Sequence, residues 1–170
     1  FISKNQDIFI YHKTKLVPGA EVIPYPSLFN KFKDFFSIGG FAGNYVKGKN
    51  TSIFNIDGVD ILPLICYESV FGDIITSKNI DLIAIITNDG WWKNTAGYKQ
   101  HFDYARLRAI EQRKSVVRSA NTGISGLIHP DGEVIKQTKW DEEAVFRVSV
   151  PVNNVTTFYN HFGDYIGRIF

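Results

Sequence analysis

Residues 82–92 read LIAIITNDGWW, an apolar run that passes directly into a polar and aromatic loop. A short, continuous apolar run is typical of a strand that is buried on both faces, as in a parallel sheet. An earlier run, VDILPLIC at 59–66, also reads as a strand, and its Pro63 is expected at an edge or a bulge. Each strand ends in a residue that can carry chemistry, Cys66 in one case and Asn88 in the other.

The remaining elements alternate in type around these two strands. Helices are predicted at 70–78 and, more clearly, at 98–114; the apolar stripe of the second consists of Phe102, Ala105, Ala109 and Ile110. Asp57-Gly58 predicts a hairpin turn. Residues 24–50 are predicted as a long loop with one or two helical turns near 27–36. Further strands are predicted at 8–11, 52–56, 116–120, 124–129, 133–136 and 144–150. This order predicts a mixed α/β layer fold.

Composition and charge restrict the possible classes of protein. The 170 residues have the length of one domain, and a net charge of +2 gives no basis for a nucleic-acid partner. The single cysteine excludes an internal disulfide, and no run of about 18 apolar residues predicts a membrane-spanning helix. The chain begins with Phe1 and contains no Met, so we expect it to be a piece or a processed form of a longer protein.

Cys66 is the candidate nucleophile. It follows an apolar strand and precedes a predicted helix, which places its thiol at the carboxyl end of a strand, where α/β sheets carry their active sites. Backbone N–H groups at a helix start would also favour the thiolate, the reactive form of cysteine. Considered alone, a single cysteine is more often a small buried core residue. The catalytic interpretation therefore depends on partners.

Lys13 and two glutamates are candidates for those partners. A lysine close to Cys66 would stabilise the thiolate and the oxyanion of a tetrahedral intermediate, although a single lysine is by default a surface charge. Glu68 lies two residues after the thiol, and Glu21 follows a Pro-Gly turn. Spacing alone identifies neither glutamate as the general base.

The loop after residue 87 contains Asn88, Trp91 and Trp92, which are the candidates for substrate binding. Tryptophans on a loop can cap the core or form an apolar wall for a substrate, and the sequence favours neither interpretation. His12 and His101 are interpreted as ordinary surface or core histidines. The sequence contains no metal-ligand spacing, no glycine-rich phosphate loop and no Gly-x-Ser-x-Gly elbow.

Five blocks of sequence resemble the apolipoprotein N-acyltransferase branch of the nitrilase superfamily. In family order they are YHKTKLVP (11–18), ICYES (65–69), TNDGWW (87–92), QHFDYARLRAIE (100–111) and RSANTGIS (118–125). Several blocks in the right order are far more specific than any one of them.

The resemblance implies a nitrilase-like αββα sandwich and a Glu-Lys-Cys catalytic set with no metal or organic cofactor. Cys66 would take a fatty acyl group from a phospholipid as a thioester and pass it to the amino-terminal diacylglyceryl-cysteine of an apolipoprotein. Lys13 would hold the oxyanion, helped by the backbone N–H after the nucleophile, and Glu21 would support the lysine. Tyr67 and Glu68 match positions that flank the nucleophile.

Two departures from the family pattern lead to further expectations. Gly19-Ala20-Glu21 stands where the branch commonly reads Phe-Gly-Glu, so the turn differs while the glutamate keeps its offset. The general-base Glu of the family lies upstream of the lysine, and residues 1–12 contain none. We therefore expect the amino-terminal part of the sandwich to be missing and the chain to be inactive alone. Residues 1–156 would be this truncated domain, and the aromatic segment 157–170 would lead toward a membrane segment.

The whole enzyme would act at the bacterial inner membrane, with its catalytic domain on the periplasmic side. Two other functions are open. The first is a soluble nitrilase-type amidase, in which water resolves the thioester at Cys66, again with Lys13. The second is a non-catalytic binding or scaffold domain, which an unreactive Cys66 would indicate.

Overall fold

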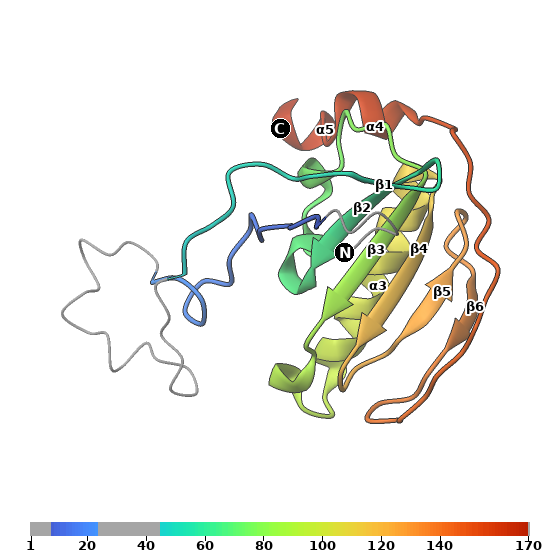
Figure 1. Ribbon diagram of the computed structural model, residues 1–170. Coiled ribbons are helices and arrows are strands. Elements are labelled where there is room, and N and C mark those ends of the chain that lie inside the picture. Colours follow the sequence, from blue (N-terminus) through green and yellow to red (C-terminus); the bar gives the residue numbers. More distant parts are fainter. Residues whose placement is uncertain (1–7, 24–44, 170) are drawn as a thin grey trace. The chain divides into compact units, whose positions relative to one another are not determined.

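The computed structural model describes residues 8–23 and 45–169, which divide into two compact units (Figure 1). The sheet unit consists of residues 1–10 and 52–170, and the lysine unit consists of residues 11–51. The helical turns predicted near 27–36 lie outside the described residues.

A six-stranded sheet is the main element of the sheet unit, and its strands lie in sequence order from β1 to β6 (Figure 1). The strands are β1 (Phe54–Ile56), β2 (Val59–Ile65), β3 (Leu82–Thr87), β4 (Ser115–Ala120), β5 (Gly126–Ile128) and β6 (Val134–Gln137). The central three, β2 to β4, are parallel, and the outer three pair antiparallel. The carboxyl ends of the three parallel strands therefore meet at one edge of the sheet.

The turn between β1 and β2 and the position of Pro63 confirm two predictions. Asp57 and Gly58 form the turn with φ angles of 51° and 84°, the left-handed values that a tight hairpin requires. β1 pairs with β2 only at Val59–Ile61, so Pro63 lies beyond it and pairs with Ala84 of β3. Among the described strands, Pro63 has a paired strand on one side only. This edge position is one in which a sheet tolerates a residue without an N–H.

The helix α3 (Ala96–Gln112) lies along one face of the parallel strands (Figure 1). Thr95 caps its amino end by accepting a hydrogen bond from the N–H of Gly97, and Arg113 ends it with a left-handed φ of 52°. Each fully buried Leu, Ile or Phe between helix and sheet contributes about 1.5–3 kcal/mol of hydrophobic free energy. This core consists of Leu62, Leu64, Ile74, Ile75, Ile80, Ile83, Ile85, Phe102, Ala105, Ala109, Val116 and Ile128.

The buried face of α3 is more polar than predicted. Ile110 was expected on the apolar stripe and is instead 40% exposed, whereas Arg108 and Gln112 were expected outside it and are buried. Arg108 is paired with Glu111 at 3.1 Å, and Gln112 accepts a hydrogen bond from Asn160 at 2.7 Å. Polar side chains can be buried when they form hydrogen bonds or ion pairs in the core. The spacing of apolar residues in the sequence does not predict those partners.

β3 is buried mainly on the face that carries α3. Ile83 and Ile85 are 0% and 1% exposed on this face, but Ile86 on the other face is 63% exposed. The prediction that both faces of this strand are buried is therefore wrong for the described part of the chain. An all-apolar strand does not specify which of its faces is covered.

Three predicted elements do not form as expected. The helix at 70–78 is replaced by two short 3-10 turns, η3 (Cys66–Val70) and η4 (Gly72–Ile74), because Phe71 between them is extended. The predicted strand at 8–11 shows only a single bridge residue, and the one at 144–150 is irregular. Val145 is fully exposed. An apolar run forms a strand only where a neighbouring strand satisfies its backbone groups.

The carboxyl-terminal segment forms two short helices, α4 (Phe158–Phe162) and α5 (Ile166–Ile169). Polar contacts attach it to the rest of the sheet unit: Thr157 donates to the backbone carbonyl of Glu111 at 2.6 Å, and the carbonyl of Asn160 accepts from the N–H of Ser77 at 2.7 Å. Of the helices in the described residues, none has both the length and the apolar character needed to cross a bilayer.

Candidate active site

Cys66 lies at the carboxyl end of β2, as predicted, on a strained turn. It is the first residue of η3, and its φ of 53° is in the left-handed region that non-glycine residues rarely adopt. The residue is partly buried. Because Ile65 pairs with Ile86 of β3, the thiol and the loop after β3 lie at the same edge of the sheet.

The residues that follow Cys66 support this turn. The carboxylate of Glu68 is fully buried and accepts a hydrogen bond from the N–H of Ile65 at 2.8 Å. The ring of Tyr67 meets that of Phe71 edge to face, with centroids 4.9 Å apart. The expected helix after Cys66 is only the five-residue η3, so a long helix dipole does not act on the thiol.

The predicted substrate-binding residues lie on the loop after β3, which contains η5 (Gly90–Trp92). Trp91 and Trp92 are 53% and 47% exposed, and the side-chain oxygen of Asn88 accepts from the N–H of Gly90 at 3.0 Å. The indole of Trp92 is so close to Gly97 of α3 that a side chain there would overlap it. Trp92 thus packs on the start of α3, while Trp91 keeps half of its surface open to solvent.

Lys13 and Glu21 are brought together in the lysine unit. The ammonium of Lys13 donates to both carboxylate oxygens of Glu21 at 2.8 and 2.7 Å. The turn before Glu21 uses Gly19 at a φ of 84°, and the N–H of Val17 donates to the same carboxylate at 2.8 Å. Lys13 belongs to a different unit from Cys66, so their proximity stays a prediction.

The structure also reveals a buried ionic network that the sequence analysis missed. Asp89 accepts hydrogen bonds from Arg118 at 2.8 Å, from His101 at 2.8 Å and from Thr87 at 3.1 Å. Arg118 also donates to the carbonyl of Ile124. Asp89, His101 and Arg118 are 0%, 4% and 3% exposed, so the three charged or titratable groups are almost completely shielded from solvent.

The electrostatics of this network favour an ionised Asp89. Burial of the carboxyl group acts to raise its pKa, but the hydrogen bond from His101 and the charge of Arg118 outweigh burial and hold the pKa below its ordinary value of 3.8. A buried carboxylate with a guanidinium partner is rigid, because neither charge can turn to water.

The network reaches the turn of the nucleophile. The second ring nitrogen of His101, Nε2, lies 3.2 Å from the backbone oxygen of Cys66 and 3.1 Å from the hydroxyl of Ser69. Ser69 is fully buried and donates to the same Cys66 oxygen at 2.8 Å. Three elements, η3, α3 and the loop after β3, therefore converge beneath Cys66.

One signal in the sequence could have indicated this network. Arg118 stands next to apolar residues in a predicted strand, and Asp89 lies two residues after the end of another. Charged residues are almost never fully buried unless they are paired, so two opposite charges at neighbouring strands predict an ion pair. His101 gives no comparable signal, because a histidine on a helix is compatible with many environments.

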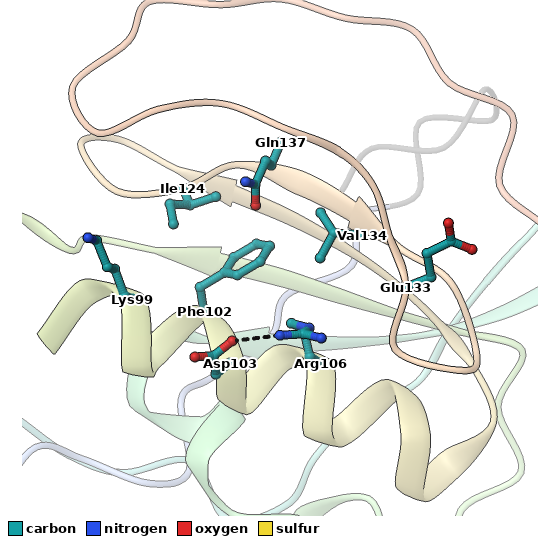
Figure 2. Close-up of a pocket in the computed structure, with 8 residues that line it drawn as sticks. All are labelled: Lys99, Phe102, Asp103, Arg106, Ile124, Glu133, Val134 and Gln137. Atoms are coloured by element: carbon teal, nitrogen blue, oxygen red, sulfur yellow. Dashed lines mark hydrogen bonds and ion pairs between the residues drawn. The ribbon is translucent and has the colours of Figure 1, made fainter. Parts of the chain in front are cut away.

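A separate hollow of about 460 Å³ lies between α3 and the segment around β6 (Figure 2). It is lined by Lys99, Phe102, Asp103, Arg106, Ile124, Glu133, Val134 and Gln137. Asp103 and Arg106 form an ion pair across one turn of the helix, as the dashed line in Figure 2 marks. None of the predicted site residues lines this hollow. No group of three or more potential metal ligands occurs in the described parts of the chain.

Comparisons with known proteins identify the family of the chain. The sequence model of the carbon-nitrogen hydrolase family matches residues 1–160. The apolipoprotein N-acyltransferase of Bradyrhizobium diazoefficiens is 36% identical over 158 residues, which cover 91% of this chain and 29% of that protein. The one from Rickettsia prowazekii is 32% identical over 165 residues, or 95% of this chain and 32% of that protein. The chain thus spans about a third of the length of these relatives.

Solved structures give the fold. Saccharomyces cerevisiae Nit3, a member of the nitrilase superfamily, is similar with a TM-score of 0.52 at 16% identity, over 64% of this chain and 42% of Nit3. An amidase from Nesterenkonia sp., with acrylamide added at its active-site cysteine, gives a TM-score of 0.51 at 15% identity, over 77% of this chain and 47% of the amidase. The predicted nitrilase-like α/β fold is confirmed. With this fold and a sequence match along nearly its whole length, the chain belongs to the carbon-nitrogen hydrolase family.

Proposed function

We propose that the chain carries the nucleophile of an acyltransferase. The enzyme would move a fatty acyl group from a phospholipid, through a thioester at Cys66, to the amino-terminal diacylglyceryl-cysteine of an apolipoprotein. The observation that carries the proposal is the backbone of Cys66, which holds a partly buried thiol at positive φ at the end of β2. Strain of this kind collects at catalytic residues, and the similarity to N-acyltransferases extends over the same part of the chain.

The reaction has two balanced steps. The Cys66 thiolate attacks the ester carbonyl of the phospholipid, a carbon–sulfur bond forms, and the carbon–oxygen bond breaks to release the lysophospholipid, which takes up a proton. The amine of the acceptor then attacks the thioester carbonyl, loses a proton to a general base, and expels the Cys66 thiolate. Both steps pass through a tetrahedral intermediate with an oxyanion, so donors aimed at that oxygen accelerate both.

The described residues support distinct roles in this reaction. Lys13 would stabilise the oxyanion together with the N–H of Tyr67, and Glu21 would orient the lysine through their two-oxygen contact. Glu68 is fully buried and bound to the N–H of Ile65, so we assign it to the support of the turn rather than to proton transfer. The resemblance implies a general-base Glu upstream of Lys13.

The loop after β3 supplies a surface for the acyl chain in this proposal. Trp91 is half exposed at the edge of the sheet where Cys66 lies, and an indole offers a large apolar face beside a polar N–H. Trp92 would hold the loop on α3, and Asn88 would fix its bend through Gly90. The reactive thioester would therefore form next to an apolar wall.

The carboxyl-terminal segment would face the membrane. Four of its apolar side chains are more than half exposed: Phe158 is 60%, Phe162 54%, Ile166 56% and Ile169 70% exposed. Exposed aromatic and aliphatic side chains of this kind suit the interface between lipid headgroups and acyl chains. We place the enzyme at the bacterial inner membrane, with this domain on the periplasmic side.

A soluble amidase is the second candidate, and the similarity of the fold to a Nesterenkonia sp. amidase favours it. The amidase would form the same thioester at Cys66 from an amide and resolve it with water. The two functions therefore differ in the group that accepts the acyl chain, not in the nucleophile.

The decisive experiment uses the complete protein that contains this chain, with labelled phospholipid as donor and a diacylated lipopeptide as acceptor. We expect Cys66→Ala to abolish transfer of the label and Cys66→Ser nearly to abolish it, because a serine hydroxyl is a poorer nucleophile than a thiolate. Lys47→Ala, at an exposed position, serves as the matched control. Full transfer by Cys66→Ala would refute the proposal, and amide hydrolysis without acyl transfer would establish the amidase.

A further inference from the structure

The strained backbone at Cys66 must be stabilised by contacts with neighbouring residues. A left-handed φ at a non-glycine residue persists only where surrounding contacts over-determine the backbone. At Cys66 the φ is 53°, and two described side chains contact its backbone oxygen. That oxygen is therefore one anchor of the turn, beside the contact of Glu68 with the N–H of Ile65.

Two buried groups contact the Cys66 oxygen. The hydroxyl of Ser69 donates to it at 2.8 Å, and Nε2 of His101 lies 3.2 Å away. On its other side His101 places Nδ1 2.8 Å from the carboxylate of Asp89. Nδ1 also lies 3.2 Å from the guanidinium of Arg118, so polar groups hold both ring nitrogens. On the Nε2 side, the ring reaches the Cys66 oxygen and the Ser69 hydroxyl.

His101 is itself held in place from behind. The carboxylate that faces its ring is fixed by the guanidinium of Arg118 at 2.8 Å and by the hydroxyl of Thr87 at 3.1 Å. Gly123 lies so close to this carboxylate that any side chain at this position would overlap Asp89. The ring of His101 consequently has little freedom to turn away from Cys66.

Fixing the Cys66 oxygen also fixes the next N–H. In a planar trans peptide the C=O of one residue and the N–H of the following residue point in opposite directions. A carbonyl held by His101 and Ser69 on the buried side therefore directs the N–H of Tyr67 toward the opposite side. That N–H is the backbone donor that the proposed reaction assigns to the oxyanion.

We infer that His101 and Ser69 are positioning residues that lock the Cys66–Tyr67 peptide and so aim the Tyr67 N–H at the oxyanion, with Asp89 and Arg118 holding His101 for this task. The inference rests on the proposed role of Cys66 as the acylated nucleophile. It assigns a function to a buried network that would otherwise serve only stability.

The test compares two variants at one position in the complete protein. His101→Gln places an amide donor where Nε2 stood and keeps the contact with the Cys66 oxygen, whereas His101→Asn places its amide near Nδ1 and keeps only the contact with Asp89. Acylation of Cys66 is measured with a p-nitrophenyl ester as the release of p-nitrophenolate, and alkylation of the same thiol is measured with iodoacetamide. Alkylation is a displacement that forms no oxyanion.

We expect His101→Asn to lower kcat of acylation about 100-fold with KM nearly unchanged, the usual loss for one oxyanion donor. His101→Gln should remain within about fivefold of the wild type, and the alkylation rate should change little in both variants. Ser69→Ala removes one hydroxyl from the same oxygen and should give an intermediate loss, so the inference remains testable if both His101 variants unfold.

The inference is overturned if His101→Asn and His101→Gln acylate equally fast, or if acylation and alkylation fall together in either variant or in Ser69→Ala. The first result would mean that the network acts on Asp89 alone, and the second that it maintains the fold in general. Failure of the proposed role of Cys66 as nucleophile is seen separately, because Cys66→Ser would then release p-nitrophenolate as fast as the wild type.

Discussion

Two ion pairs in this molecule have nearly the same geometry and very different surroundings. Asp89 and Arg118 lie 2.8 Å apart in the sheet unit with both side chains fully buried. Lys13 and Glu21 lie 2.7 Å apart in the lysine unit, with side chains 12% and 30% exposed. The buried pair cannot exchange a partner for water, so its removal leaves an uncompensated charge. The Lys13–Glu21 pair is only partly buried, so its removal should cost less stability than removal of the buried pair.

The two ion pairs are suited to different roles, one in supporting the fold and the other in the reaction. A rigid, buried pair can hold a backbone in a strained conformation, as Asp89 and Arg118 do for the network beneath Cys66. A partly buried ammonium that is oriented by one carboxylate can stabilise a charge that develops during a reaction. We therefore expect changes in the buried pair to appear in the free energy of unfolding, and changes in the exposed pair to appear in rates.

The largest effect is expected from Asp89→Asn. The amide keeps the shape of the carboxylate but removes its charge, which leaves Arg118 buried without a counter-ion, so the free energy of unfolding should fall by about 3–5 kcal/mol. Urea unfolding measures this loss. Asp103→Asn is the matched control, because Asp103 forms an exposed pair with Arg106, and its removal should cost no more than about 1 kcal/mol. Equal losses of stability in the two variants would contradict the view that the buried pair stabilises the fold more than the exposed pair does.

The pH dependence of unfolding sharpens the same contrast. The folded protein holds the pKa of Asp89 below its ordinary value of 3.8, so folding favours the ionised carboxylate. Its contribution to stability is complete above that ordinary value and is lost as the pH falls through the lower pKa of the folded state. Between about pH 6 and pH 3 the wild type should therefore lose more stability than Asp89→Asn. A steeper loss in the variant would contradict the direction of the shift.

The next largest effect is expected from Lys13→Ala, and it should appear in the rate. Removal of one oxyanion donor should raise the barrier to acylation by about 3–4 kcal/mol. The free energy of unfolding should change by about 1 kcal/mol, less than in Asp89→Asn, because a partly exposed ion pair adds less stability than a fully buried one. Single-turnover acylation and urea unfolding of the same preparation measure both quantities, with Lys47→Ala as the control. An acylation rate equal to the wild type would show that Lys13 does not reach the oxyanion of Cys66.

The sequence predicted the two strands that place the site and failed where structure depends on distant neighbours. β2, β3 and their shared edge follow from two apolar runs and from the residues that end them. The apolar run at 144–150 has equally good strand residues, but in the described residues it forms no strand pairing. The helix at 70–78 fails because Phe71 is extended, and nothing in the local pattern encodes that conformation.

The site shows the same division. Cys66 at a strand end could be predicted, since its position depends on the order of elements along the chain. The roles of His101 and Ser69 could not, because each depends on a contact with the backbone oxygen of Cys66. Every residue has a backbone oxygen, so the sequence does not indicate which side chains will bind a particular one. Those partners are seen only in the structure.

A smaller effect is expected from Gly123→Ala, which perturbs the buried pair without removing a charge. A methyl group at this position would overlap the carboxylate of Asp89, so the carboxylate or the turn must move. Overpacking of this kind typically lowers the free energy of unfolding by about 1–3 kcal/mol. Gly58→Ala is the comparison, because no atom lies within 4 Å of a methyl group there and its cost comes from the left-handed φ of 84° alone. If Gly123→Ala unfolds like the wild type, the buried network is looser than its distances indicate.

The smallest effect on stability is expected from Glu21→Gln. The amide can still accept the N–H of Val17 and a hydrogen bond from Lys13, so the turn should remain and the free energy of unfolding should change by less than about 1 kcal/mol. Acylation should fall less than in Lys13→Ala, by about tenfold or 1.4 kcal/mol, because the lysine keeps its charge and loses only its anchor. High salt should reduce the wild-type rate toward that of the variant, since partly exposed charges are screened. If Glu21→Gln instead lowered the free energy of unfolding by several kcal/mol, Glu21 would have a structural role like that of Asp89. The two ion pairs would then differ only in their exposure.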